Sequence, residues 1–162
     1  AAINCAGGDV IIFLLYSGLR RSELINLLWT DYDANTGHLK IRKSKTEAGV
    51  RVILLPLKAR EVINKRPRCS KWIFTSQADR QLNYTSIKRI YMRIREKTGL
   101  YSFTTHVCRH TFATRLSEEG ASPKAVADLL GHKKVDYALK IYTDLEKLKT
   151  VKEVKRLDHL NL

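Results

Sequence analysis

The chain has 162 residues, of which 44% are hydrophobic and 28% charged, a balance that indicates one globular domain with a buried core. Thirty Lys and Arg residues against 16 Asp and Glu residues give a formal net charge of +14. A domain this basic usually binds a polyanion, most often a nucleic acid. An anionic membrane surface is the weaker candidate, because the basic residues are spread along the chain instead of gathered in one tail or helix.

Cysteine usage and hydropathy indicate the compartment. Cys5, Cys69 and Cys108 lie far apart and form no CxxC pair, which favours a reduced cytoplasmic setting over a disulfide framework. The longest apolar run, VIIFLLY at 10–16, is too short to span a bilayer and lacks signal-peptide flanks. We therefore expect a cytoplasmic protein with no membrane partner.

The chain begins with two predicted helices. Asp9 is placed to cap a buried helix that runs to about Tyr16, and Gly18 is placed to end it. A second helix is expected over 22–28, with its leucines facing inward, before a turn-rich stretch.

A β-hairpin is predicted next. Residues 38–43 and 50–55 have strand character and are joined by SKTEAG, which gives the hairpin a basic tip, and Pro56 closes it. The stretch KWIFT at 71–75 predicts a further short strand.

The rest of the chain is expected to be mainly helical. Periodicity and caps, including Thr104 or Thr105 and the pair Ser122–Pro123, predict helices over 58–65, 85–97, 105–119 and 123–130 and from about 136 onward. The helix at 85–97 carries a basic outer face that either is only solvated or contacts phosphates. The predicted fold class is mostly α with a small antiparallel β-sheet (α+β).

The stretch THVCRHTFATRL at 105–116 carries the densest chemistry, and one interpretation of it is a metal site. His106 and His110 have the helical i, i+4 spacing of two ligands. The glutamate of the zinc motif HExxH is replaced by Val107, and no further ligand lies near unless Cys108 or His132 is recruited. We therefore predict no metal.

The other interpretation is an anion site. Arg109 lies one turn from His106 and can share its face. Arg20 and Arg21 stand just before a predicted helix start, which favours anions, and Glu23 is placed to hold one guanidinium. A surface salt bridge remains the alternative for each arginine alone.

Covalent chemistry at a phosphate would need a nucleophile. Tyr142 lies on the inward stripe of the last predicted helix, and a core tyrosine is the simpler interpretation of it. Tyr137 is an alternative closer to His132. Lys45 lies in the hairpin connection, where its side chain either reaches a bound ligand or is only solvated.

The order of these motifs is more specific than any one of them. SGLRRSEL, then KSKT in a hairpin, then THVCRHTFATRL, then LLGH and a tyrosine ten residues on resemble the catalytic domain of the tyrosine recombinases, the phage integrase family, over about 10–145. The pattern is most similar to integrases of bacterial phages and conjugative transposons. The resemblance implies the DNA breaking-rejoining fold, with 1–162 as a single catalytic domain and the N-terminal core-binding domain absent from this chain.

The resemblance also implies roles. Arg20 and Arg109 hold the scissile phosphate, and Tyr142 is the nucleophile. His106 assists proton transfer, His132 hydrogen-bonds the phosphate, and Lys45 protonates the leaving oxygen. Glu23 and His110 are supporting residues. The expected DNA-binding residues are Arg21, Lys43, Lys88, Arg89, Arg93 and Lys133.

The implied activity is site-specific recombination through a 3′-phosphotyrosyl intermediate, without metal, ATP or other cofactor. The implied partner is double-stranded DNA carrying an attachment site, bound by a homo-tetramer of otherwise monomeric subunits with accessory DNA-bending or excision factors. The segment 145–162 is either exchanged between subunits or packed on its own domain. The expected location is the bacterial cytoplasm, at the nucleoid. A type IB topoisomerase-like enzyme and a non-enzymatic DNA-binding module are the alternatives.

Overall fold

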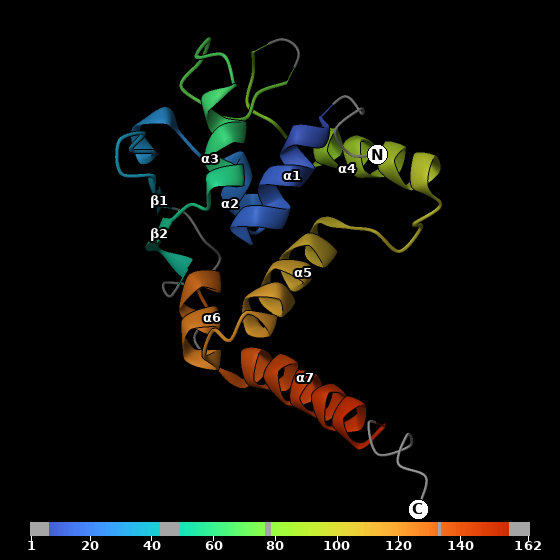
Figure 1. The fold of residues 1–162 in the computed structure, drawn as a ribbon. Helices are drawn as coiled ribbons and strands as arrows, with labels where there is room; N and C mark the ends of the chain where they lie inside the picture. The colour runs from blue at the N-terminus through green and yellow to red at the C-terminus, as the bar shows by residue number, and fades with distance from the viewer. Residues whose placement is uncertain (1–6, 43–48, 77–78, 133, 156–162) are drawn as a thin grey trace, which may run out of the picture.

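The structure, a computed structural model, describes residues 7–42, 49–76, 79–132 and 134–155 (Figure 1). Within these ranges it contains α-helices, one short 3-10 helix and a two-stranded antiparallel sheet. In chain order the elements are α1 (Gly8–Ser17), α2 (Arg21–Ile25), η1 (Trp29–Asp31), β1 (His38–Ile41), β2 (Arg51–Leu54), α3 (Leu57–Asn64), α4 (Tyr84–Thr98), α5 (Thr105–Glu118), α6 (Pro123–Leu130) and α7 (Asp136–Lys155). The predicted α+β class is confirmed.

Two hydrophobic clusters meet along α5. The larger surrounds α1, which packs on α3 and α5 and buries Phe13 and Leu14 completely. The smaller joins α5, α6 and α7 around Ala113 and Leu130. Because α5 contributes to both clusters, its residues between them are held from two sides.

The hairpin and the helix caps agree with the sequence. β1 and β2 pair antiparallel with His38 opposite Leu54, over fewer residues than predicted. The Thr104 hydroxyl accepts a hydrogen bond from the Val107 N–H and so caps α5. Ser122 caps α6 in the same way, as predicted. The hairpin connection, with Lys43 and Lys45, lies outside the described residues.

Asp9 does not cap α1. Gly7 occupies the cap position without a side-chain bond, and the Asp9 carboxylate pairs with Arg66 instead. A guanidinium is a stronger partner for a carboxylate than a backbone N–H, so the prediction was wrong for an electrostatic reason.

Two other predictions were also wrong. α2 ends at Ile25, and the chain then turns into η1, where the Leu28 N–H donates to the Asp31 carboxylate. Residues 71–75 form no strand: Trp72 and Thr75 make only isolated bridges. Without a neighbouring strand to extend the pairing, strand-like residues stay irregular.

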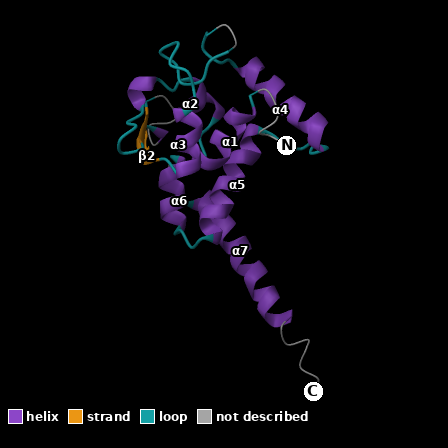
Figure 2. Ribbon diagram, turned by 45° about the horizontal axis from the view of Figure 1, so that its top comes forward, coloured by secondary structure: helices purple, strands orange, loops and turns teal. Residues whose placement is uncertain are grey.

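The last helix extends away from the rest of the domain. Its first turns pack on α5 and α6, and Figures 1 and 2 both show its later turns projecting beyond the other elements. Among the helices of the described ranges, none combines the length and apolar character of a membrane-spanning segment.

Candidate active site

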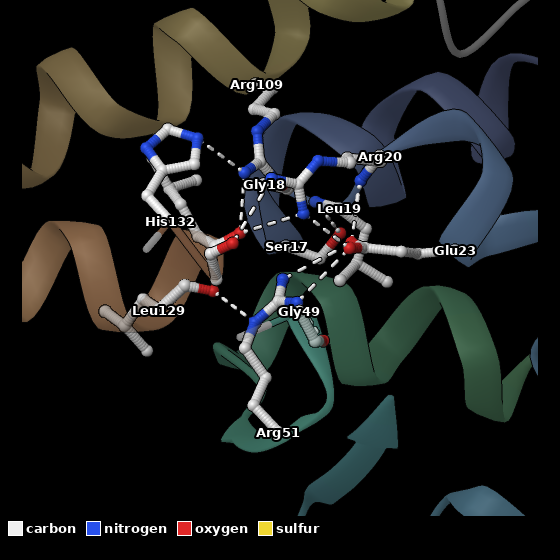
Figure 3. Close-up of polar contacts among 12 residues, drawn as sticks. Ser17, Gly18, Leu19, Arg20, Glu23, Gly49, Arg51, Arg109, Leu129 and His132 are labelled. Atoms are coloured by element: carbon white, nitrogen blue, oxygen red, sulfur yellow. Dashed lines mark hydrogen bonds and ion pairs between the residues drawn. The ribbon is translucent and has the colours of Figure 1, made fainter. Parts of the chain in front are cut away.

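Among the described residues that were predicted to be catalytic, Arg109 is the most deeply buried. Its side chain leaves the middle of α5 between the two hydrophobic clusters and is only 4% exposed. Nη1 donates to the Gly18 carbonyl oxygen at 2.7 Å, and Nη2 donates to the Leu130 carbonyl oxygen at 2.5 Å (Figure 3). These bonds satisfy a buried cation and fix its plane.

Arg20 converges on the same place from the start of α2. Nη1 donates to Glu23 Oε1 at 2.8 Å, and Nη2 donates to the Gly131 carbonyl oxygen at 3.2 Å. Glu23 also accepts from the Arg20 backbone N–H, so one carboxylate caps the helix and orients the guanidinium. The expected contact between Glu23 and a guanidinium is present, and a supporting role of Glu23 in catalysis stays a prediction.

A third arginine, Arg51, joins them and was missed by the sequence analysis. Nε donates to the Leu129 carbonyl oxygen at 2.7 Å, and the two terminal nitrogens contact Glu23 at 3.3 Å (Figure 3). Alternation along β2 was the available signal, because Arg51 shares the inward face of buried Ile53 and Leu55. We call Arg20, Arg51 and Arg109 the arginine cluster.

The arginine cluster surrounds the carboxyl end of α6. The carbonyls of Leu129, Leu130 and Gly131 accept its hydrogen bonds, and this helix end also carries the negative pole of the helix dipole. Arg20 and Arg51 pair with the buried carboxylate of Glu23, whereas Arg109 bonds carbonyls, so the three guanidiniums carry more positive charge than Glu23 neutralises.

This charge alters the pKa values of its neighbours. Burial, together with Arg20 and Arg51, lowers the pKa of Arg109 to about 10, which leaves it charged at neutral pH. Burial, then Arg109, Arg20 and Arg51, lowers the pKa of His132 to about 4. His132 is therefore neutral at physiological pH.

The tautomer of His132 follows from its contact with Arg109. His132 Nε2 lies 2.9 Å from Arg109 Nη2, and a guanidinium only donates, so Nε2 accepts and Nδ1 carries the proton. Nδ1 is buried and has no hydrogen-bond partner within the part of the chain that the structure describes. An N–H donor that no described residue engages thus lies buried beside the arginine cluster.

Two cavities meet at these side chains. One, of about 480 Å³, is lined by Arg20, His106, Arg109, His132 and Tyr137, together with Gly131, Lys134 and Asp136. The other, of about 370 Å³, shares Arg20, His106 and Arg109 and is lined further by Arg21, Ser22, Tyr84, Tyr91, Thr104 and Thr105. Their shared wall is basic, as an anion site requires.

The tyrosine that lines the cavity of about 480 Å³ is Tyr137. Its ring meets the rings of His110 and His132 edge-on, with centroids 5.7 and 5.2 Å away, and burial raises its pKa. Tyr142, five residues later on α7, is half-buried and does not line either cavity. At 100° per residue the two side chains leave α7 on different sides.

The other predicted residues have diverse positions. His110 is exposed and also contacts the Thr114 hydroxyl at 3.3 Å. The Arg21 guanidinium stacks over the Tyr84 ring at 4.2 Å, and the α4 side chains Lys88, Arg89 and Arg93 are exposed. Lys43, Lys45 and Lys133 lie outside the described residues.

The side chains do not favour the metal interpretation of HVCRH. Cys108 is fully buried, and burial raises its pKa to about 12, so it offers no thiolate at neutral pH. In the described ranges, no three His, Cys, Asp or Glu side chains are grouped as metal ligands would be.

Comparison with known proteins agrees with the geometry. Residues 4–149 match the model of the phage integrase family. The tyrosine recombinase XerA of Thermococcus kodakarensis is 32% identical over 91% of this chain and 55% of the relative. A XerC-like tyrosine recombinase of Caldanaerobacter subterraneus is 25% identical over 92% of this chain and 49% of the relative.

Solved structures show the same fold. The crystal structure of XerA recombinase superposes with a TM-score of 0.74 at 23% identity, covering 96% of this chain and 57% of that one. The Tn1549 transposon integrase, in complex with transposon right end DNA, gives a TM-score of 0.73 at 24% identity, covering 88% and 58%. The chain spans about half the length of the curated relatives it matches. It belongs to the phage integrase family, with the fold of a tyrosine recombinase catalytic domain.

Proposed function

We propose that this domain catalyses site-specific DNA recombination by transesterification at a phosphodiester. The observation that carries the proposal is the convergence of Arg20 and Arg109 with His106 and His132 on one cavity. Phosphoryl transfer places extra negative charge on the non-bridging oxygens in the transition state. Guanidiniums already fixed by carbonyls and a carboxylate stabilise that charge without reorganising.

The proposed nucleophile is Tyr142, because it stands at the tyrosine position of the family motif, ten residues after His132. Its oxygen attacks the phosphorus, the bond to the 5′ oxygen breaks, and a 3′-phosphotyrosyl bond forms. His106 takes up the phenol proton, because a neutral phenol is a poor nucleophile. Lys45 gives a proton to the leaving 5′ oxygen, and His132 donates to a non-bridging oxygen.

A 5′-hydroxyl from the partner duplex then attacks the phosphotyrosyl bond and restores a phosphodiester. The bond energy is conserved throughout, so the reaction requires no ATP. The arginine cluster supplies the positive charge that a metal ion provides in other nucleases. Cleavage by the metal-free protein in EDTA is therefore expected at the full rate, and restoration of a lost rate by added Mg²⁺ would contradict this.

The position of Tyr142 sets a requirement. Because it does not line the cavity, DNA binding has to bring its oxygen there, either by a movement of α7 or from a second subunit. The projecting helix supports both routes (Figure 2). We accordingly propose double-stranded DNA as the partner and a tetramer of monomeric subunits assembled on it, with accessory DNA-bending or excision factors.

The test uses a nicked DNA that carries the attachment site and loses its short 5′ fragment on cleavage, so that the covalent product accumulates. The full-length protein containing this domain should yield a covalent protein–DNA band. Tyr142→Phe should abolish the band and Tyr137→Phe should retain it. A band that survives Tyr142→Phe but not Tyr137→Phe would assign the nucleophile to Tyr137. No band with the unmodified protein would overturn the enzymatic proposal and leave a DNA-binding module.

A further inference from the structure

We infer that Arg51 is a positioning residue of the proposed active site: it fixes Glu23 and the carboxyl end of α6, and thereby the geometry of Arg20 and Arg109. The inference rests on the proposed function and deepens it.

Arg51 uses its guanidinium almost entirely inside the protein. Its side chain is 9% exposed, and its nitrogens donate to the carbonyls of Leu129 and Gly49, both at 2.7 Å, and to both Glu23 oxygens. Arg51 lines neither of the two cavities at the arginine cluster. It is therefore placed to hold other residues and not to hold a phosphate.

The first group that Arg51 holds is Glu23. This carboxylate is 1% exposed, and a buried charge is stable only with close partners. Arg20 meets it at 2.8 Å and Arg51 at 3.3 Å, from different elements of the fold. Without Arg51, Glu23 would lose one of its two closest guanidinium partners, and its charge would act more strongly on Arg20 and draw that guanidinium away from the cavity.

The second group is the end of α6. Arg51 bonds the Leu129 carbonyl, while the next two carbonyls accept from Arg109 and Arg20. The three guanidiniums thus bond three consecutive carbonyls, and Arg20 also donates to the Leu130 carbonyl at 3.4 Å (Figure 3). Removing the first bond would free the Leu129 carbonyl and loosen the helix end that precedes His132.

Arg66 provides a matched comparison. It is also a mostly buried arginine, 14% exposed in its side chain, that pairs with a carboxylate, Asp9, and donates to a backbone carbonyl, that of Ile73. Arg66 lies just after α3, contacts α1 through Asp9, and lines neither cavity at the arginine cluster. Replacing it should reduce stability and leave the reacting groups in place.

The experiment compares Arg51→Met, Arg51→Lys and Arg66→Met in the full-length protein with the nicked DNA. For each, the rate of covalent product formation at saturating DNA, the DNA dissociation constant and the thermal midpoint are measured. Arg51→Met should slow cleavage about ten- to a hundredfold, the range typical of groups that orient ligand-holding residues. Its dissociation constant should change less than about threefold, because Arg51 does not line the cavities. Arg51→Lys should cleave faster than Arg51→Met but more slowly than the unmodified protein, because lysine keeps the positive charge and lacks the planar set of guanidinium donors.

Arg66→Met should lower the thermal midpoint with an unchanged rate per folded molecule. The inference is overturned if Arg51→Met cleaves as fast as the unmodified protein, or if Arg51→Met and Arg66→Met lose rate only in proportion to their folded fraction. It is also overturned if Arg51→Met weakens DNA binding as much as it slows cleavage, which would make Arg51 a phosphate anchor. Failure of the proposed function is distinguishable, because the unmodified protein itself would then form no covalent product.

Discussion

Arg109 donates from Nη1 to the carbonyl oxygen of Gly18 at 2.7 Å, across 91 positions of the sequence. The bond joins the middle of α5 to the residue that ends α1. Gly18 has a φ of +64°, a backbone conformation that residues other than glycine rarely adopt. A Cβ built on it would also lie 2.3 Å from the Phe112 ring, one turn after Arg109. The arginine therefore depends on a glycine for its acceptor.

We predict that Gly18→Ala destabilises the domain by about 2–4 kcal/mol, from the left-handed backbone and the overpacking of Phe112 together. Gly99→Ala is the matched control, because Gly99 has a φ of +70° and nothing within 4 Å of its added Cβ. It should cost only about 1 kcal/mol. Chemical denaturation gives both free energies of unfolding, and equal losses at the two positions would contradict the predicted clash.

The helices that could be predicted from the sequence are those whose residues interact within one or two helical turns. The helices over 84–98, 105–118 and 123–130 follow from apolar periodicity and from capping residues that act within one turn. Asp9 was mispredicted because a distant partner, Arg66, binds its carboxylate, and at the end of the short α2 the Ile25 carbonyl accepts from Gln81, 56 positions away. Local patterns carry no information on such partners.

The same limit applies to the site. Arg20, His106, Arg109 and His132 could be selected because family motifs mark them, and they do meet at one cavity. Arg51 belongs to no such motif, and its role depends on β2 lying against the end of α6. The position of Tyr142 outside the cavity likewise depends on the rotation of α7, which a helical pattern leaves undetermined.

Arg109 should be needed for cleavage much more than for DNA binding. Arg109→Ala removes a charge aimed at the transition state and should slow covalent product formation at least about a hundredfold, as loss of an oxyanion donor does. The DNA dissociation constant should rise only a few-fold, because other phosphate contacts remain. Both quantities are measured on the nicked DNA. Equal losses in cleavage and binding would reduce Arg109 to a phosphate anchor.

The basic residues of α4 should differ in their contribution to DNA binding. Lys88 lies on the same helical stripe as Tyr84 and Tyr91, which line a cavity of the arginine cluster. Arg89 and Arg93 lie on another side and line a separate cavity with Gly7, Asp9 and Arg66. Lys88→Gln should therefore lower the slope of log affinity against log salt by about 1, and Arg93→Gln by less. A larger loss for Arg93→Gln would place the DNA on the other side of α4.

His132 should make the stability of the domain depend on pH. Its folded pKa of about 4 lies below its ordinary value of 6.5, because burial and Arg109, Arg20 and Arg51 oppose a second positive charge. The unfolded chain then binds the proton more readily than the folded one. This contribution is constant above about pH 7, and stability falls as the pH drops from 6.5 to 4.

We expect this contribution to be about 1–2 kcal/mol, because partial exposure of the imidazole weakens the effect of the neighbouring charges. The free energy of unfolding is measured by urea denaturation at pH values from about 4.5 to about 7.5. As the pH is lowered over this range, it should fall more steeply for the unmodified protein than for His132→Gln. His38→Gln, at an exposed position on β1, is the matched control and should keep the steeper slope. If His132→Gln leaves the slope unchanged, the imidazole is not held neutral by the arginine cluster, and its proposed role as a neutral donor to the phosphate fails with it.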